Sequence, residues 1–488
     1  MVTRPLITTL AAALLAACAV GPDHVRPTMA VPETFGVQAP ATDPAASVPV
    51  AAPAEGAFWQ AFGDPQLTAL VDEALTANHD LRVALARFDR ANALLRSARF
   101  DQLPTIDASG RATSSRASAD QAPGVPRADR DSDAFEAGIG ASWELDLFGR
   151  VRRGVEAGRA EAAASADDLR ALQVAIVGEV ATAYLDLRGL QERLRVATEN
   201  AGNQQHTLAL VDARRNAGQD SDFDSARASA QAASTASRIP ALEAEIAVAT
   251  HRIAVLTGRT PDALRDALSA ARDLPAVPRA IDPGTPADVV RLRPDVSAAE
   301  HRLHAATARV GVATADLFPR LTLGGLIGSQ AGDVDALFKR DSETRLVALG
   351  IDWSFLDIGR VRARIAAADA DAELELARYQ QTVLRALEDT GNALARFDRA
   401  HDEDVELARA ARDSARAARL ARMRFEAGAT GLLDVLDAER TQLQAEDAFA
   451  AGRTRTATGA VALYRALAGG WPQSLPQRES LDTQVSQR

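Results

Sequence analysis

Residues 150–216 form a segment without proline in which apolar residues recur every seven positions. Two series interleave: the first is Ile176, Ala183, Leu190 and Ala197, and the second is Val180, Leu187, Leu194, Ala201 and Leu208. This a/d pattern predicts a helix that packs as a coiled coil. At ~1.5 Å per residue, a helix of about 65 residues is on the order of 100 Å long, which exceeds the needs of a globular domain.

Ahead of this segment the apolar residues alternate instead. Between residues 134 and 145 they alternate with Glu, Gly and Ser, and residues 347–355 repeat that pattern. Residues 105–115 and 320–330 alternate more weakly, and turn-forming residues separate the members of each pair. Alternation is the pattern of a strand with one apolar and one polar face. Four strands are therefore predicted, two in each half of the chain.

The two halves are copies of one unit. Residues 143–152 read WELDLFGRVR, and residues 353–362 read WSFLDIGRVR, at an offset of 210 positions. The same offset pairs Glu179 with Asp389, Gly218 with Gly428 and Asp224 with Asp434. Upstream, an offset of 215 pairs Asp80 with Asp295 and Pro104 with Pro319. Matches that persist along the chain at a fixed period indicate a duplication.

Each unit is expected to contain a helix, two strands and a long helical hairpin. The first helix is predicted over 67–99 in one unit and over 287–317 in the other, each stopped by the proline that follows. Glycine-containing turns at 216–222 and 426–431 reverse the chain, and a returning helix is expected to run to Gly258 or Gly469. Gly218 and Gly428 are expected to supply the backbone geometry of these turns.

The amino terminus has the features of a secretory signal. Arg4 precedes an apolar stretch over 10–15, and Cys18 follows Leu15-Ala16-Ala17. This run resembles the bacterial lipobox, which implies cleavage before Cys18 and a diacylglycerol on its sulfur. An incidental cysteine near an ordinary cleavage site is the alternative. Ala19 follows the cysteine rather than Asp, and in lipoproteins an Asp there favours retention in the inner membrane, so the outer membrane is predicted.

The predicted strands have the length of outer-membrane strands, about 9–11 residues. Four strands cannot close a barrel, because a filled barrel needs about eight. An open sheet in lipid would leave backbone groups unpaired. Several chains must then share one barrel: two chains would supply eight strands and three would supply twelve. A soluble four-stranded sheet on a helical stalk is the alternative.

Composition argues against several other classes of protein. The chain has 55 Lys and Arg against 66 Asp and Glu, a net charge of −11, which disfavours nucleic-acid binding. Its single cysteine allows neither a disulfide framework nor a cysteine zinc site. His301 and His304 beside Glu300 have a spacing that suits a metal, but no third ligand is evident. No metal site, no cofactor other than the lipid on Cys18, and no enzymatic site are predicted.

Several motifs resemble one family. Residues 291–303 (RLRPDVSAAEHRL), Phe318-Pro319 and residues 424–437 (RFEAGATGLLDVLD) resemble the TolC-type outer membrane factors. The lipobox and residues 21–27 (GPDHVRP) resemble their lipoprotein branch, the NodT-like lipoproteins that serve RND efflux pumps. The resemblance covers essentially the whole mature chain. It implies a mainly α protein with a membrane β part: a homotrimer in which each chain gives four strands to a 12-stranded barrel and long helices to a periplasmic α-barrel.

On this reading the chain has six parts. They are a signal peptide over 1–17, a lipidated Pro-rich strap over 18–57, a first repeat over 58–258 (strands within 104–145, hairpin 149–258), an equatorial connection over 259–285, a second repeat over 286–469 (strands within 319–355, hairpin 359–469) and a C-terminal tail over 470–488.

Asp434 and Asp437 lie three apart, on one face of the helix that follows the second reversal. Taken alone, acids in a first turn are explained by the helix dipole. In a trimer, however, six carboxylates would converge on one opening and set a field that favours cations and excludes anions. The resemblance implies this role, because the family has an Asp ring at the matching positions of its periplasmic constriction.

The resemblance also implies a lock that holds this constriction shut, made by an Asp in the first reversal with a Tyr and an Arg in the second. Asp224 matches the Asp, but Phe425 and Thr430 stand where the Tyr and the Arg would be. That lock therefore cannot form here. Arg422 or Arg424 is the alternative partner.

The function implied is a passive exit duct of a tripartite efflux pump for small molecules such as drugs or toxic compounds. Its partners would be an inner-membrane RND-type transporter, outer-membrane lipid and a periplasmic adaptor that meets the hairpin tips at Gly218 and Gly428. The alternatives are a duct for type I protein or peptide secretion and a non-channel lipoprotein that scaffolds the envelope, which would have no use for the alternating strands. The substrate and the individual pump cannot be read from the residues.

Overall fold

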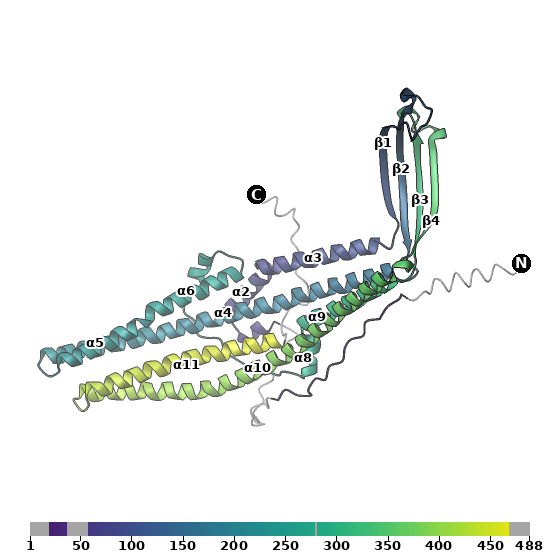
Figure 1. Ribbon diagram of the computed structural model, residues 1–488. Coiled ribbons are helices and arrows are strands. Elements are labelled where there is room, and N and C mark those ends of the chain that lie inside the picture. Colours follow the sequence, from purple (N-terminus) through teal and green to yellow (C-terminus); the bar gives the residue numbers. More distant parts are fainter. Residues whose placement is uncertain (1–18, 37–56, 279–280, 468–488) are drawn as a thin grey trace. The chain divides into compact units, whose positions relative to one another are not determined.

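The computed structural model describes residues 19–36, 57–278 and 281–467 (Figure 1). Its helices and strands are, in order, α2 (Pro65–Ala77), α3 (His79–Phe100), β1 (Thr105–Arg116), β2 (Asp131–Leu145), α4 (Arg150–Asn216), α5 (Asp222–Ala236), α6 (Arg238–Leu256), α7 (Arg265–Ser269), α8 (Pro286–Leu292), α9 (Pro294–Ala315), β3 (Arg320–Ala331), β4 (Glu343–Asp352), α10 (Ile358–Glu426) and α11 (Leu432–Ala466).

The chain divides into two compact units, which are described one at a time. The strand unit comprises the described parts of Met1–Thr28, Arg87–Ser165 and Ala298–Gln380. The hairpin unit comprises the described parts of Met29–Ala86, Ala166–Ser297 and Gln381–Arg488. Each unit therefore draws on both halves of the duplicated sequence.

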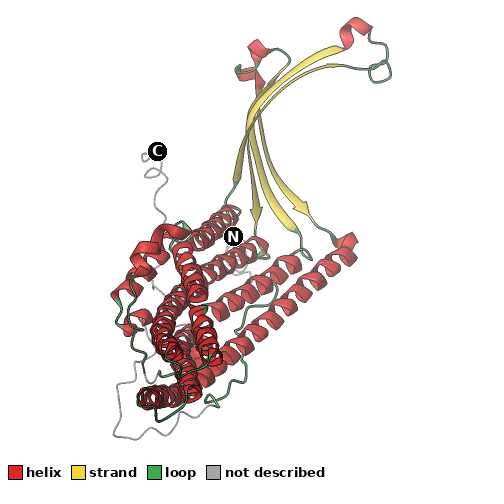
Figure 2. Cartoon of the chain, turned by 90° about the vertical axis from the view of Figure 1, so that its left-hand side faces the viewer, coloured by secondary structure: helices red, strands yellow, loops and turns green. Residues whose placement is uncertain are grey.

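The strand unit holds one antiparallel sheet in the order β1-β2-β3-β4, which curves along its length (Figure 2). The strands lie where alternation predicts them, with one difference. β4 ends at Asp352, so Trp353 and Phe355 lie beyond the strand, and Phe355 begins a short 3-10 turn (Phe355–Asp357). The expectation that these two aromatic residues extend the strand was wrong.

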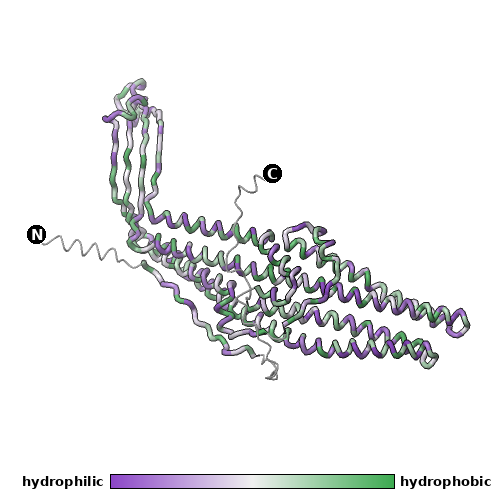
Figure 3. Tube along the Cα trace, turned by 180° about the vertical axis from the view of Figure 1, so that it is seen from behind, coloured by the Kyte–Doolittle hydropathy of each residue, from purple (hydrophilic) through white to green (hydrophobic). Residues whose placement is uncertain are grey.

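Register sorts the side chains of the sheet onto two faces, because residues opposite each other on paired strands point the same way. Ile139 pairs with both Ala108 and Ile327, and Leu323 pairs with both Trp143 and Leu349. This face is apolar and open to its surroundings: Ile139 is 60 % exposed and Ile327 is 70 % exposed. The opposite face carries mainly Glu, Gly, Ser, Thr and Asp. Hydrophobic and hydrophilic residues accordingly intersperse along all four strands in Figure 3.

The long helix predicted over 150–216 is α4, with the same bounds. No residue of its two seven-residue series is exposed. α10 is its counterpart in the second repeat and runs over Ile358–Glu426. No helix in the described part of the chain has the length and hydropathy of a membrane span.

Each short helix predicted ahead of the strands is instead two helices. α2 and α3 break at Asn78, and α8 and α9 break at Arg293, where the backbone is extended (ψ 130° and 123°). The Asn78 side chain ends one helix and caps the next, since its Oδ1 accepts from the backbone N–H groups of Asp80 and Leu81. Arg293 precedes Pro294, whose ring disfavours helical geometry at the residue before it.

The first returning helix is also broken, whereas the second is continuous. α5 ends at Ala236 and α6 starts at Arg238, while α11 runs unbroken over Leu432–Ala466. Pro240 has no N–H to donate to the carbonyl of Ala236, and this position is where the break falls. The first returning helix, predicted to run unbroken to Gly258, is therefore two helices.

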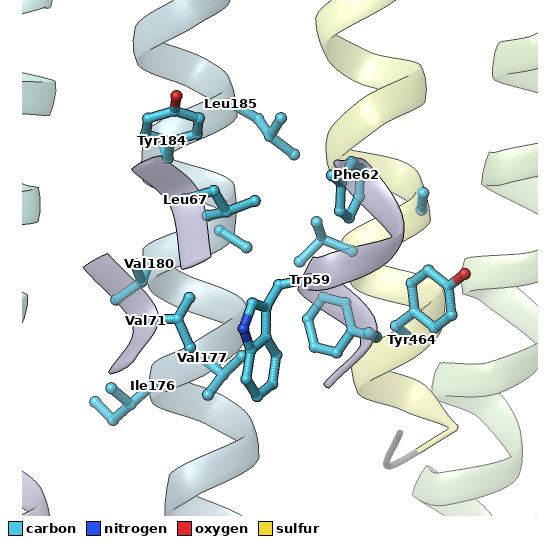
Figure 4. Packing of buried hydrophobic residues seen from close by; sticks show 14 of the residues in the cluster. Trp59, Phe62, Leu67, Val71, Ile176, Val177, Val180, Tyr184, Leu185 and Tyr464 are labelled. Atoms are coloured by element: carbon cyan, nitrogen blue, oxygen red, sulfur yellow. The ribbon is translucent and has the colours of Figure 1, made fainter. Parts of the chain in front are cut away.

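The core of the hairpin unit lies where short helices pack on the long ones (Figure 4). The 3-10 helix η2 (Phe58–Phe62) buries Trp59 and Phe62 in a cluster with residues of α2, α4 and α11, and Phe58 stacks on Tyr464 with ring centroids 5.0 Å apart. Tyr184 donates to Asp64, the N-cap of α2. Burial, assisted by this carboxylate, raises the pKa of Tyr184 to about 12. Aromatic side chains of η2, α4 and α11 thus meet in one buried cluster.

Candidate functional site

The two hairpin ends share one backbone conformation. Gly218 and Gly428 adopt φ values of +73° and +72°, and each follows the last turn of a long helix. In both turns the next residue donates back to the helix: Gln219 to Arg214 (2.9 Å) and Ala429 to Arg424 (2.7 Å). Only glycine adopts this left-handed region without strain. The predicted geometric role of the two glycines matches this structure.

Asp434 and Asp437 lie in the first two turns of α11, and both side chains are exposed. The Thr430 hydroxyl donates to Asp434, and Arg440 forms an ion pair with Asp437. That ion pair is more than half exposed on both sides, so it contributes little to stability. The N-cap of the helix, Gly431, offers no side chain. Both carboxylates are therefore accessible to a cation at this end of the hairpin unit.

Asp224, the matching acid of the first hairpin end, is committed to its own helix. Ser221 and Asp224 form a reciprocal capping box at the start of α5. Hydrogen bonds from the Ser221 hydroxyl and backbone hold the pKa of Asp224 below its usual value. Its carboxylate thus serves the first turn of α5.

Phe425 is buried in an apolar cluster at the hairpin ends. Its side chain is 3 % exposed and packs with Val211 of α4, Ala228 of α5 and Val435 of α11. The guanidinium of Arg214 lies over the ring, 4.8 Å from its centroid. The three residues at the family's lock positions thus serve separate purposes: Asp224 caps α5, Thr430 bonds to Asp434, and Phe425 joins the two hairpins through apolar contact.

One buried acid near this site escaped the sequence analysis. Glu439 of α11 is 1 % exposed and bonds to Thr207 of α4 and Arg422 of α10. A signal for it exists, because Leu432, Glu439 and Glu446 step by seven. The series begins with an apolar residue, and charged residues are unusual on such a seam. Arg422, proposed from sequence as a partner for Asp224, is instead the partner of Glu439.

The segment after Cys18 is fixed to the strand unit, while Cys18 itself lies outside the described residues. Arg153 of α4, whose side chain is 5 % exposed, donates to the carbonyls of Val20 and Gly21 and pairs with Asp23 at 2.6 Å. His24 stacks on His304 of α9 with ring centroids 4.4 Å apart. Residues 20–24 of the strap are therefore bound to α4 and α9.

His304 lies against a carboxylate. Its Nε2 lies 2.9 Å from Glu156, and within the described residues no group of His, Cys, Asp and Glu is arranged to hold a metal ion. Burial would raise the pKa of Glu156, but hydrogen bonds from His304 and Arg153 outweigh burial and lower it. Burial first, and the neighbouring His304 second, lower the pKa of His24.

Comparison with known proteins identifies the family that has this architecture. The sequence profile of the family described as outer membrane efflux protein matches residues 70–259 and 286–469. The chain is 32 % identical over 474 residues to outer membrane protein OprJ of Pseudomonas aeruginosa, covering 95 % of each chain. It is 34 % identical over 462 residues to the pyoverdine export outer membrane protein OpmQ of Pseudomonas putida, covering 93 % of this chain and 95 % of that protein.

Solved structures agree with these relatives. The outer-membrane channel OprN superposes with a TM-score of 0.85 at 41 % identity, covering 93 % of this chain and 100 % of that one. The open state of the MtrE outer membrane channel of Neisseria gonorrhoeae gives a TM-score of 0.81 at 28 % identity, covering 94 % and 100 %. These proteins are channels rather than enzymes. The chain belongs to the outer membrane efflux protein family and is an outer-membrane efflux channel.

Proposed function

We propose that three copies of this chain form a passive duct through the outer membrane. The observation that carries the proposal is the sheet, which exposes an apolar face and ends in two unpaired strand edges, on β1 and β4. An exposed apolar face suits lipid. Unpaired backbone groups in lipid are costly, so β4 of one copy pairs with β1 of the next until the ring closes. Three copies give twelve strands and an open lumen.

The duct carries small molecules such as drugs or toxic compounds. Relatives support this class of cargo by name: the solvent efflux pump protein SrpC and the antibiotic efflux pump protein ArpC of Pseudomonas putida are 29 % and 30 % identical to this chain. In the assembled pump an inner-membrane RND-type transporter supplies the energy. A periplasmic adaptor joins the transporter to the duct at the hairpin ends around Gly218 and Gly428.

The second hairpin end forms the selective entrance. Each chain exposes Asp434 and Asp437 on one face of α11, where Asp434 accepts from the Thr430 hydroxyl and Asp437 pairs with the exposed Arg440. Three chains around one axis bring six carboxylates together, which attracts cations and repels anions. In this proposal the ring is the narrowest point of the duct.

Cys18 carries lipid and anchors the chain to the outer membrane. Support comes from the strap, since residues 20–24 are held by Arg153 and His304, which keeps the lipidated end beside the strand unit. One diacyl anchor adds about 0.8 kcal/mol per buried CH₂, a small contribution beside an inserted barrel. Cys18→Ser behind a conventional signal peptide should therefore still assemble, in somewhat lower yield. Complete loss of membrane-inserted protein would contradict this role.

Reconstitution of the full chain into planar bilayers tests the duct. Cation-selective conductance is expected, and a deletion strain should become more susceptible to several unrelated drugs, with recovery on complementation. Conductance that is absent even after Asp434 and Asp437 are changed to Ala would favour a non-channel scaffold. Unchanged drug susceptibility with lost export of a protein would favour type I secretion.

In the proposed duct the hairpin ends face the periplasm and the loop between β3 and β4 faces the outside of the cell. This orientation can be tested, because Lys339 is the only lysine of the chain and lies exposed in that loop. A membrane-impermeant amine reagent applied to intact cells should label the peptide that contains Lys339. Labelling that requires disruption of the outer membrane would place this loop on the periplasmic side and contradict the proposed orientation.

A further inference from the structure

Polar side chains interrupt the contact between α4 and α11, where a coiled-coil seam is normally apolar. α11 lies between α4 and α10 in Figure 1. Three residues of α4 spaced by seven each contact an acid of α11: Arg193 with Asp447 (2.7 Å), Asn200 with Glu446 (2.8 Å) and Thr207 with Glu439 (2.9 Å). Polar layers of this kind set which residues face each other, at a cost in stability.

Glu439 makes the most buried of these contacts and joins three helices. Its side chain is 2 % exposed. Oε1 accepts from Thr207 Oγ1 of α4 and from Nε (3.2 Å) and Nη2 (2.9 Å) of Arg422 on α10. One carboxylate oxygen therefore ties the second hairpin together and ties that hairpin to the first.

The same region leaves buried polar atoms without partners. Among the described residues, Oε2 of Glu439 and both side-chain polar atoms of Gln204 are buried and make no hydrogen bond. Gln204 precedes Thr207 by three residues on α4, so it lies on the same face of that helix. A buried polar atom without a partner loses hydration and gains no bond in return. Around Glu439 the polar seam is thus held through one carboxylate oxygen, while the neighbouring buried polar atoms make no bond.

We propose that Glu439 is a positioning residue that sets how firmly the second hairpin end is held against the first. It follows Asp434 and Asp437 on α11, and the apolar cluster of Phe425 and Val435 lies beyond it toward the tip. A change in its ion pair shifts the start of α11 relative to α4 and moves the carboxylate ring. The inference rests on the proposed entrance, and it supplies a hold that the family's lock residues do not supply in this chain.

A buried ion pair predicts opposite effects for two kinds of variant. Removing Arg422 leaves the Glu439 carboxylate buried without its cation, which is destabilising. Replacing both partners with apolar residues removes the buried charge, and such replacements are often neutral or stabilising. A loosened hairpin end widens the entrance, and a tightened one narrows it.

The experiment compares Arg422→Met, Arg422→Leu with Glu439→Leu, and the control Arg419→Met, in the full-length protein in planar bilayers. Arg419 is an exposed arginine about one turn before Arg422 on α10. Arg422→Met should raise the mean conductance per channel at least threefold. The double variant should conduct no more than the wild type, and the control should equal it. Conductance of Arg422→Met equal to the wild type, or a double variant as open as Arg422→Met, would overturn the proposal.

Hydrogen exchange over residues 432–443 provides a readout that does not depend on conduction. Protection should fall at least tenfold in Arg422→Met and return to the wild-type level or above it in the double variant. If Arg422→Met fails to assemble, the double variant still decides, since lower protection than the wild type would overturn the proposal. A residue that serves only the fold would change the yield of trimers and leave conductance per channel unchanged, which also overturns it.

Failure of the duct itself gives a different pattern. A wild-type protein without conductance would refute the proposed function, while reversal of hydrogen-exchange protection between the two variants would still support the role of Glu439. A conducting wild type with unchanged variants would refute only the role of Glu439.

Discussion

Both repeats join their short helices to the end of the returning helix by one side-chain hydrogen bond. In the first repeat Asn78 Nδ2 donates to the carbonyl of Leu256 at 2.9 Å. In the second, Arg293 Nη1 donates to the carbonyl of Ala466 at 3.2 Å. These donors and acceptors are related by the offsets of 215 and 210 that relate the repeats. The duplication has kept the contact while the residue that makes it has changed.

The hairpin ends show the opposite: an aspartate stands at the matching position of both repeats, but its hydrogen bonds differ. Asp224 and Asp434 occupy matching positions, three residues after the N-cap of their helices. Ser221 caps the first helix and engages Asp224, whereas Gly431 has no side chain and Asp434 stays exposed. The residue at the N-cap thus decides which acid takes part in a capping box and which does not.

The seat of the N-terminal strap also differs between repeats. The strap passes so close to α9 that a Cβ on Gly21 would lie 2.4 Å from the Cα of Gly311. At the matching position of α3 stands Arg96, which would block such an approach. α3 and α9 are matching helices of the two repeats, and the size of the side chain at this position determines which of them the strap can approach. The repeats therefore share the contact at the helix junction. They differ at the N-cap of the returning helix and at the surface that receives the strap.

The largest expected effect tests the difference between the two acids. Asp434→Ala with Asp437→Ala should weaken block by trivalent cobalt hexammine about a hundredfold, equivalent to ~2.7 kcal/mol. Asp224→Ala, the matched control at the first end, should leave block unchanged. Single-channel recording measures each case.

Equal block in the wild type and in the variant that lacks both Asp434 and Asp437 would show that these two acids only support their helix. In that case the variant should lose roughly 0.3–1 kcal/mol of local stability per residue instead.

The shared junction provides the next largest effect. Asn78→Ala removes the bond to Leu256 and the cap of α3, so local opening of α3 should become easier by about 2 kcal/mol. Hydrogen exchange of the reconstituted protein measures this change. Asn92→Ala is the control, because Asn92 in mid-α3 bonds only to the Phe88 carbonyl one turn earlier. Equal protection in both variants would mean that packing alone holds the junction.

The two glycine turns should respond alike. Gly218→Ala and Gly428→Ala force alanine to a left-handed φ, at a cost of about 1 kcal/mol each. No atom lies near the added methyl group, so strain is the only cause. Gly202→Ala in the exposed interior of α4 should instead stabilise by about 0.5–1 kcal/mol. Hydrogen exchange at the two ends compares them, and an effect at only one end would refute their equivalence.

The smallest expected effect concerns the strap, which is held by Arg153 of the first repeat and by α9 of the second. The lowered pKa of His24 means that the released strap binds a proton more readily than the seated one. Binding of the strap to its site should be strongest above pH 6.5, the unperturbed pKa of histidine. It should weaken as pH falls below that value and stop changing once pH is below the lowered pKa of His24. Exchange of residues 19–36 between pH 8 and 5 measures this effect.

His24→Phe keeps a ring to stack on His304 and cannot titrate, so its strap should show no such dependence. A persistent dependence in that variant would assign the effect to another group, such as His304 or Glu300, which face the strap.

Much of this protein was readable from its residues. The seven-residue series predicted that α4 packs as a coiled coil, and the proline-free stretch between Gly149 and the turn at 216–222 gave its bounds. Alternation located the strands, and the offset repeats exposed the duplication, because each depends on local periodicity. The glycine turns followed from residue type alone. The breaks at Asn78, Arg293 and Ser237 were missed, although the side-chain cap and Pro294 and Pro240 were present in the sequence as signals.

Only the tertiary structure decided how those elements use their side chains. The apolar face of the sheet depends on register across three strand pairs, which no single strand specifies. The burial of Glu439 depends on α4, which belongs to the other repeat, packing against α11 together with α10, its neighbour in the hairpin. Periodicity describes one element and the face that it offers. Which residue meets that face, and whether a charge there is paired, is settled by packing between distant segments.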